Sequence, residues 1–140
     1  MIVLREGQIE VTAPTVTAKL LQGLHKKLDV LEQDKEHFYV IYLNSRLKII
    51  AVEINSIGTV NASIVHPREV FRRAIIENSV QLIVAHNHPS EDCAPSEADI
   101  QITQRLQKAG EIVGIEIIGH IIFGQTTYFS FKEEEIFGMN

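Results

Sequence analysis

The sequence predicts an α/β protein, built as a three-layer α/β/α sandwich around a mixed β-sheet. Segments with helical spacing of apolar residues alternate along the chain with short runs of β-branched and aromatic residues. The 140 residues suffice for one sizeable core but not comfortably for two. We therefore expect a single domain over residues 1–140, in the order helix, hairpin, helix, strand, helix and strands.

The first half of the chain is predicted to hold a short strand, a helix and a hairpin. The strand is expected within residues 1–12. Apolar residues recur at spacings of three and four over residues 16–31, which predicts one amphipathic helix preceded by Pro14. Residues 38–43 and 48–54 are rich in β-forming types and flank the turn signal Asn44-Ser45, so they predict a β-hairpin.

The second half is predicted to alternate helices and strands. Pro67 favours a helix through about residue 77, because proline is preferred at the first helical position. Residues 81–85 are an apolar run typical of a buried central strand. A helix is expected from Ser96 to about Ala109, ending at Gly110. The last strands are expected at residues 112–123 and 127–131.

Two histidines directly follow the predicted central strand. His86 and His88 are residues i and i+2 of an extended segment, so their rings can point to one side. Open α/β sheets place their sites at the carboxyl ends of strands, and Asp99 is expected in the first turn of the next helix. Two imidazoles and a carboxylate, with a fourth position for water, suit a catalytic Zn²⁺. The pattern therefore predicts a zinc site and points to hydrolysis.

The same residues have a simpler interpretation, which the sequence alone leaves open. Ser96 and Asp99 have the spacing of a capping box, and an acidic residue is favourable in a first turn in any case. The two roles are compatible, since Asp99 can start the helix and bind a metal. Cys93 lies between the ligand candidates and could approach the metal, although an ordinary loop position is favoured.

A hydrolase also needs a general base, for which Glu53 is the candidate. It lies in an apolar strand on the face shared by Ile49 and Ala51, and burying a carboxylate is costly unless it is paired or near a metal. The alternative is an edge strand that leaves Glu53 in solvent. The Ser96 hydroxyl is a candidate donor to the oxyanion that forms during attack on a carbonyl.

Composition and charge narrow the class of protein. The formal net charge of −5 argues against a protein held to nucleic acid by a broad basic surface. No apolar run approaches the roughly 20 residues that span a bilayer, so no membrane association is expected, and the first residues lack the pattern of a signal peptide. The single cysteine excludes an internal disulfide, which favours a cytoplasmic location.

Taken together, these residues resemble the metal-binding motif of the JAB/MPN metalloprotease superfamily, often called the JAMM motif. The matching pattern is Glu53, His86-x-His88, seven residues, Ser96, two residues and Asp99. From about residue 15 to the C-terminus the chain is similar to the bacterial RadC family. The segments that carry this similarity are Gly58-Thr59-Val60-Asn61, His66-Pro67-Arg68-Glu69-Val70-Phe71, Ala85-His86-Asn87-His88-Pro89-Ser90 and Pro95-Ser96.

The resemblance implies a JAB/MPN-like, cytidine-deaminase-like sandwich that binds Zn²⁺ through His86, His88 and Asp99. It implies Glu53 as general acid and base, Ser96 as the residue that steadies the tetrahedral intermediate, and hydrolysis of a peptide or isopeptide bond in a protein or peptide substrate. The family label is DNA repair. An alternative is a non-catalytic metal-binding interaction module that holds a protein or DNA-repair partner.

The chain departs from the RadC pattern in three respects. An N-terminal helix-hairpin-helix region, associated with DNA binding in full-length family members, is not expected in it. Glu91 stands where glycine is usual, and Gly119 stands where aspartate is usual.

A nucleic-acid-processing metalloenzyme is a third hypothesis, which the acidic charge disfavours. Exposed strands at the sheet edge are compatible with a homodimer.

Overall fold

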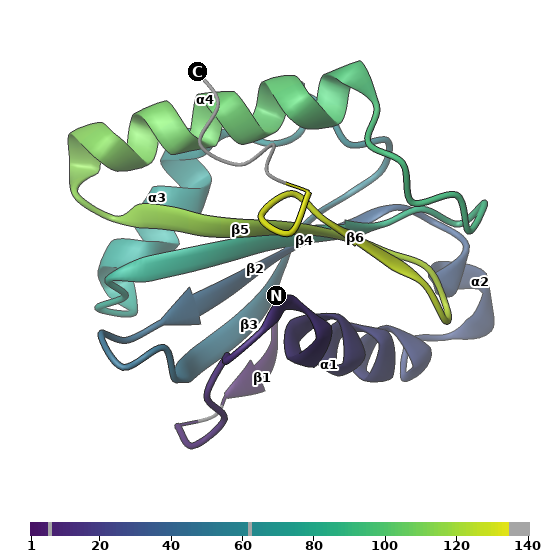
Figure 1. The fold of residues 1–140 in the computed structure, drawn as a ribbon, viewed down its shortest axis with the longest axis horizontal. Coiled ribbons are helices and arrows are strands. Elements are labelled where there is room, and N and C mark those ends of the chain that lie inside the picture. The colour runs from purple at the N-terminus through teal and green to yellow at the C-terminus, as the bar shows by residue number, and fades with distance from the viewer. Residues whose placement is uncertain (6, 62, 135–140) are drawn as a thin grey trace.

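The computed structural model describes residues 1–5, 7–61 and 63–134, and it places a six-stranded mixed sheet between helices on both faces (Figure 1). Among the described strands, neighbours pair antiparallel except β4 and β5, which are parallel. The strand order across the sheet is β1 (Ile2–Arg5), β3 (Ile49–Ile57), β2 (His37–Leu43), β4 (Gln81–Asn87), β5 (Glu116–Phe123) and β6 (Tyr128–Ser130). The predicted α/β sandwich with a mixed sheet is confirmed.

Helices cover both faces of the sheet and divide the core into two main parts. Helices α3 (Pro67–Ile76) and α4 (Glu97–Val113) lie on one face, and α1 (Pro14–Lys26), followed by the short α2 (Val30–Gln33), lies on the other (Figure 1). Successive residues of β2 point to opposite faces, so Phe38 joins the core under α3 and α4 whereas Tyr39 joins the core under α1. All seven residues of β2 are buried for this reason.

The helix predicted over residues 16–31 is wrong in its last part. Helix α1 ends at Lys26, and Leu31 falls in the separate α2, where it is 81% exposed. The side-chain amide of Gln33 donates to the carbonyls of Lys26, at 3.2 Å, and Leu28, at 2.7 Å. The bond to Lys26 satisfies a backbone acceptor that the end of a helix leaves free, and the two bonds together stabilise the turn between the two helices.

The predicted end of α4 at Gly110 is also wrong. The helix continues to Val113, and its C-cap is Gly114, whose φ of 85° is the left-handed conformation that glycine adopts easily. Gly110 lies inside the helix for a steric reason, since a Cβ there would be 2.4 Å from the carbonyl oxygen of Ile115. Residues 112 and 113 therefore belong to α4, and β5 begins only at Glu116.

The other elements agree with the predictions apart from their boundaries. β2 and β3 form the expected antiparallel hairpin, and β3 extends to Ile57. The strand expected within residues 1–12 is confined to β1, while Glu10 makes a separate bridge to Lys48; residue 6 lies outside the described residues. Within the described part of the chain, no helix has the length and apolar composition needed to cross a membrane.

Candidate metal centre

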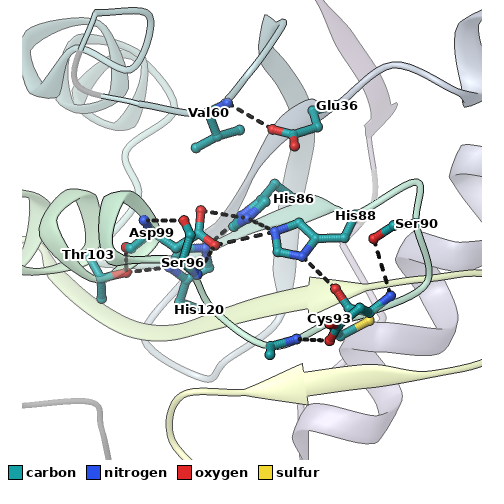
Figure 2. Close-up of polar contacts among 12 residues, drawn as sticks. Glu36, Val60, His86, His88, Ser90, Cys93, Ser96, Asp99, Thr103 and His120 are labelled. Atoms are coloured by element: carbon teal, nitrogen blue, oxygen red, sulfur yellow. Dashed lines mark hydrogen bonds and ion pairs between the residues drawn. The ribbon is translucent and has the colours of Figure 1, made fainter.

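His86, His88 and Asp99 converge at the carboxyl end of the central strand β4 (Figure 2). His86 is in β4, His88 follows the strand directly, and Asp99 lies in the first turn of α4. One ligand atom from each lies within 4.8 Å of the others. The Nε2 atom of His86 is 3.1 Å from Asp99 Oδ1, and that of His88 is 3.3 Å from Asp99 Oδ2. The structure thus brings together the three predicted ligands.

Ser96 and Asp99 also form the capping box that the spacing allows. The Ser96 hydroxyl oxygen accepts from the Asp99 backbone N–H at 3.1 Å, and Asp99 Oδ2 accepts from the Ser96 backbone N–H at 2.8 Å. The carboxylate of Asp99 therefore starts α4 and faces both histidines at once. Ser96 lies beside the cluster as expected, and its role towards an oxyanion stays a prediction.

The second nitrogen of each histidine ring is held by a hydrogen bond. His88 Nδ1 lies 2.8 Å from the carbonyl oxygen of Asp92, and His86 Nδ1 lies 2.9 Å from Nε2 of the fully buried His120. His120 in turn contacts the hydroxyl of Thr103 through Nδ1. Such partners fix the orientation of metal-binding imidazoles. The position of His120 in an apolar strand predicts a hydrogen-bonded core histidine rather than a ligand, but it does not identify His86 as the partner.

The donor atoms of the cluster fit a cation. A carbonyl oxygen only accepts hydrogen bonds, so His88 Nδ1 carries a proton, and the ring presents a lone pair at Nε2 when it is neutral. That lone pair faces the Asp99 carboxylate and, at 3.1 Å, the Nε2 atom of His86. Electron-rich atoms this close repel one another unless a cation lies between them or a proton is bound to one of them. Two imidazole nitrogens and a carboxylate are a ligand set for Zn²⁺.

The electrostatics of the ion-free cluster point the same way. Burial by itself would raise the pKa of the Asp99 carboxyl, yet hydrogen bonds from His86, His88 and the Ser96 amide hold that pKa well below its usual range. The hydrogen bond with Asp99 raises the pKa of His88 above its usual value, against the opposing effect of burial. Asp99 is thus held as an anion beside the two rings, as a metal ligand must be.

Glu53, the predicted general base, is not brought to this cluster. Its carboxylate accepts from the Tyr42 hydroxyl at 2.7 Å and pairs with Arg73 Nε at 3.4 Å. Among the described residues, none of its hydrogen bonds or ion pairs reaches the two histidines or Asp99. The reason is strand order: β3 is separated from β4 by β2, and Glu53 pairs with Val40 rather than with the end of β2 beside His86.

A different carboxylate, Glu36, lies beside the histidines (Figure 2). Glu36 directly precedes β2, the strand that pairs with β4, and it is half-buried. Its Oε2 atom accepts from the Val60 backbone N–H at 2.8 Å, and its negative charge contributes to the raised pKa of His88. Glu36 is not among the residues predicted from the sequence; an acidic residue immediately before a run of β-forming residues was the available signal.

Asn87, between the two histidines, holds the backbone on either side of Glu36. Its side-chain oxygen accepts from the His37 N–H at 2.7 Å, and its side-chain nitrogen donates to the Lys35 carbonyl at 3.0 Å. Successive residues of a strand point to opposite faces, so the segment His86–His88 directs its two rings to the cluster and the intervening amide towards the start of β2. One short segment therefore positions ligands and carboxylate together.

The two substitutions relative to the RadC pattern leave the ligands intact. Glu91, at a φ of 69°, does not reach the cluster; its carboxylate accepts from the Gln125 backbone N–H at 2.7 and 2.9 Å. A side chain at Gly119 would contact Ile83, in the core under α1, which is the opposite face from His120. An aspartate there would point away from His86.

Cys93 and a small cavity complete the surroundings. Burial raises the pKa of the Cys93 thiol, and its sulfur lies 3.4 Å from the Thr127 hydroxyl rather than among the ligands. A cavity of about 140 Å³ opens beside His88, between the loop that follows β4 and the helices α1 and α2. Its lining includes Val30 and Gln125, so it offers apolar and polar surface next to the cluster.

Comparisons with known proteins identify the family of the chain. Residues 12–136 match the family described as the RadC-like JAB domain. The chain is 52% identical over 104 residues to a UPF0758 protein of Desulforudis audaxviator (strain MP104C), covering 74% of this chain and 45% of that protein. It is 50% identical over 115 residues to a UPF0758 protein of Methanococcoides burtonii (strain DSM 6242), covering 82% and 48%. The chain spans about half the length of these relatives. It belongs to the RadC-like JAB domain family.

Proposed function

We propose that this chain is a zinc-dependent hydrolase that cleaves an amide bond, peptide or isopeptide, in a protein or peptide substrate. The observation that carries the proposal is the convergence of His86, His88 and Asp99, with the carboxylate of Glu36 beside them. Zinc bound by the three ligands would lower the pKa of a coordinated water to about 7 and polarise the carbonyl under attack.

The protein groups have separate roles in this proposal. Glu36 is the general base: its carboxylate, oriented by the Val60 N–H, takes a proton from the attacking water and returns it to the leaving amine. Ser96 donates a hydrogen bond to the developing oxyanion. Glu53 supports the sheet through Tyr42 and Arg73. The base is thus reassigned from Glu53 to Glu36.

Metal content tests the site itself. We expect about one zinc per chain in the purified wild-type protein by elemental analysis, and loss of the metal in His88→Ala. His66→Ala is a matched control, because His66 precedes α3 and lies outside the cluster. No zinc in the wild type after incubation with Zn²⁺, or zinc retained in His88→Ala, would contradict the assignment.

A pair of isosteric variants tests the base. We expect Glu36→Gln to abolish cleavage of a mixed library of peptides and lysine-isopeptide conjugates, read by mass spectrometry, while zinc content stays at the wild-type value. Glu53→Gln should retain cleavage and lower the free energy of unfolding by roughly 1–3 kcal/mol, because it disturbs a buried hydrogen-bonded carboxylate. The opposite pattern would restore Glu53 as the base. A zinc-loaded protein that cleaves nothing in the library would favour the interaction module.

A further inference from the structure

A buried series of hydrogen bonds connects His86 to the backbone of Asp99 through the side chains of His120 and Thr103, which are not themselves candidate ligands. It runs from His86 Nδ1 to His120 Nε2, from His120 Nδ1 to the Thr103 hydroxyl, and from that hydroxyl to the Asp99 carbonyl at 2.8 Å (Figure 2). Three elements contribute, namely β4, β5 and α4. This series of hydrogen bonds therefore links two of the three candidate ligands, His86 and Asp99.

Which atom donates in each of these hydrogen bonds follows from the last acceptor, the Asp99 carbonyl. A carbonyl only accepts, so the Thr103 hydroxyl donates its proton to Asp99 and must accept from His120 Nδ1. His120 is fully buried, with Phe131 stacked on it at 4.5 Å and Phe38 edge-on at 6.3 Å. A charge in that setting is costly, so the ring is neutral and its Nε2 accepts from His86 Nδ1.

We propose that His120 and Thr103 are positioning residues that fix His86 in the tautomer protonated at Nδ1, so that its Nε2 lone pair is free to bind the metal. In the other tautomer Nε2 would carry a hydrogen and could not be a ligand. The inference rests on the metal-binding part of the proposed function. It concerns how a ligand is prepared and is independent of the substrate.

Zinc affinity, measured by competition with a chromophoric chelator, is the first test. Thr103→Val keeps the shape of the side chain and removes the hydroxyl, so we expect zinc binding to weaken about 10- to 100-fold, the usual effect of losing such a partner. Thr103→Ser should restore the wild-type affinity. Thr17→Val is the matched control, since Thr17 is a buried threonine of α1, away from the cluster.

The tautomer of His86 is the second readout, and a role confined to packing would not change it. In the zinc-free wild type, ring ¹⁵N shifts recorded at alkaline pH should show that the neutral His86 ring keeps its proton on Nδ1 rather than on Nε2; Thr103→Val and His120→Leu should shift the neutral ring towards a mixture of the two tautomers. If His120→Leu does not fold, Thr103→Val and Thr103→Ser still decide the question. Unchanged zinc affinity and tautomer in Thr103→Val would overturn this inference alone. A wild-type protein that binds no zinc would overturn it together with the proposed function.

Discussion

Asp99 and Ser96 are joined by two reciprocal hydrogen bonds, and the Asp99 oxygen that accepts one of them also lies 3.3 Å from His88 Nε2. Helix initiation and the candidate metal centre therefore share one carboxylate. A residue that starts a helix is held rigidly by the helix it starts, so α4 presents its ligand with little freedom to move.

Two substitutions at Asp99 should separate these functions. Asp99→Asn keeps an oxygen for the Ser96 N–H but loses the negative charge, so we expect zinc to be lost with little change in stability. Asp99→Ala also removes the cap, which should lower the free energy of unfolding by about 0.5–2 kcal/mol. Denaturant melts of the metal-free proteins measure the difference. Equal stability of the two variants would contradict the shared role.

Asn87 should matter for turnover more than for metal. Removing its side chain in Asn87→Ala leaves the His37 N–H and the Lys35 carbonyl without their partner, so the segment carrying Glu36 is free to shift. Misplacement of a catalytic group by about 1 Å can cost about 100-fold in rate. We expect kcat for a peptide identified in the library to fall 10- to 100-fold at unchanged zinc content. A loss of zinc with unchanged kcat of the loaded fraction would contradict this view of Asn87.

Glu91 and Gly124 should be energetically coupled. A Cβ at Gly124 would lie 2.6–2.9 Å from the Glu91 carboxylate, so Gly124→Ala displaces that carboxylate from the Gln125 N–H. Because the exposed Glu91 side chain can move away, we expect Gly124→Ala to destabilise only by about the net value of the hydrogen bonds it breaks, roughly 0.5–1.5 kcal/mol. Glu91→Gly removes both the clash and a left-handed conformation that costs a non-glycine residue about 1 kcal/mol. Gly124→Ala should therefore cost much less in a Glu91→Gly background, and a double-mutant cycle with no coupling would argue against the contact.

His25 should make stability depend on pH. Burial, opposed by the Gln33 carbonyl and aided by His37, lowers the pKa of His25 below its usual value. The unfolded chain, with a histidine pKa of about 6.5, then binds more protons than the folded protein at acid pH. The contribution of His25 is therefore fully present above about pH 6.5 and is lost as the pH falls below it.

The measurement compares the wild type with His25→Gln between pH 5.5 and 7.5, both in a chelator so that zinc binding does not contribute. The free energy of unfolding should rise with pH more steeply in the wild type. Equal slopes of stability against pH in the two proteins would contradict this prediction. They would show that burial and the contact of His25 Nδ1 with the Tyr39 hydroxyl, at 2.7 Å, do not keep the His25 ring neutral.

Much of the fold and part of the site could be predicted because they depend on neighbours in sequence. Alternation along an extended segment was enough to direct His86 and His88 to one side, and a spacing of three residues was enough to place Asp99 in a capping box. Gly110 and Gly114 show the limit of local signals. Either glycine can end a helix, and the close approach of the Ile115 carbonyl is what requires Gly110 inside α4.

The sequence by itself thus determined the α/β class, the positions of most elements and the three ligand candidates, because periodicity and spacing act within one element or one loop. Only the tertiary structure decided that Glu36 rather than Glu53 accompanies the histidines, and that His120 and Thr103 lie behind His86. Those contacts depend on strand order and register. Hydrogen bonds between strands join residues far apart in the chain, so local spacing does not show which carboxylate they bring to the histidines.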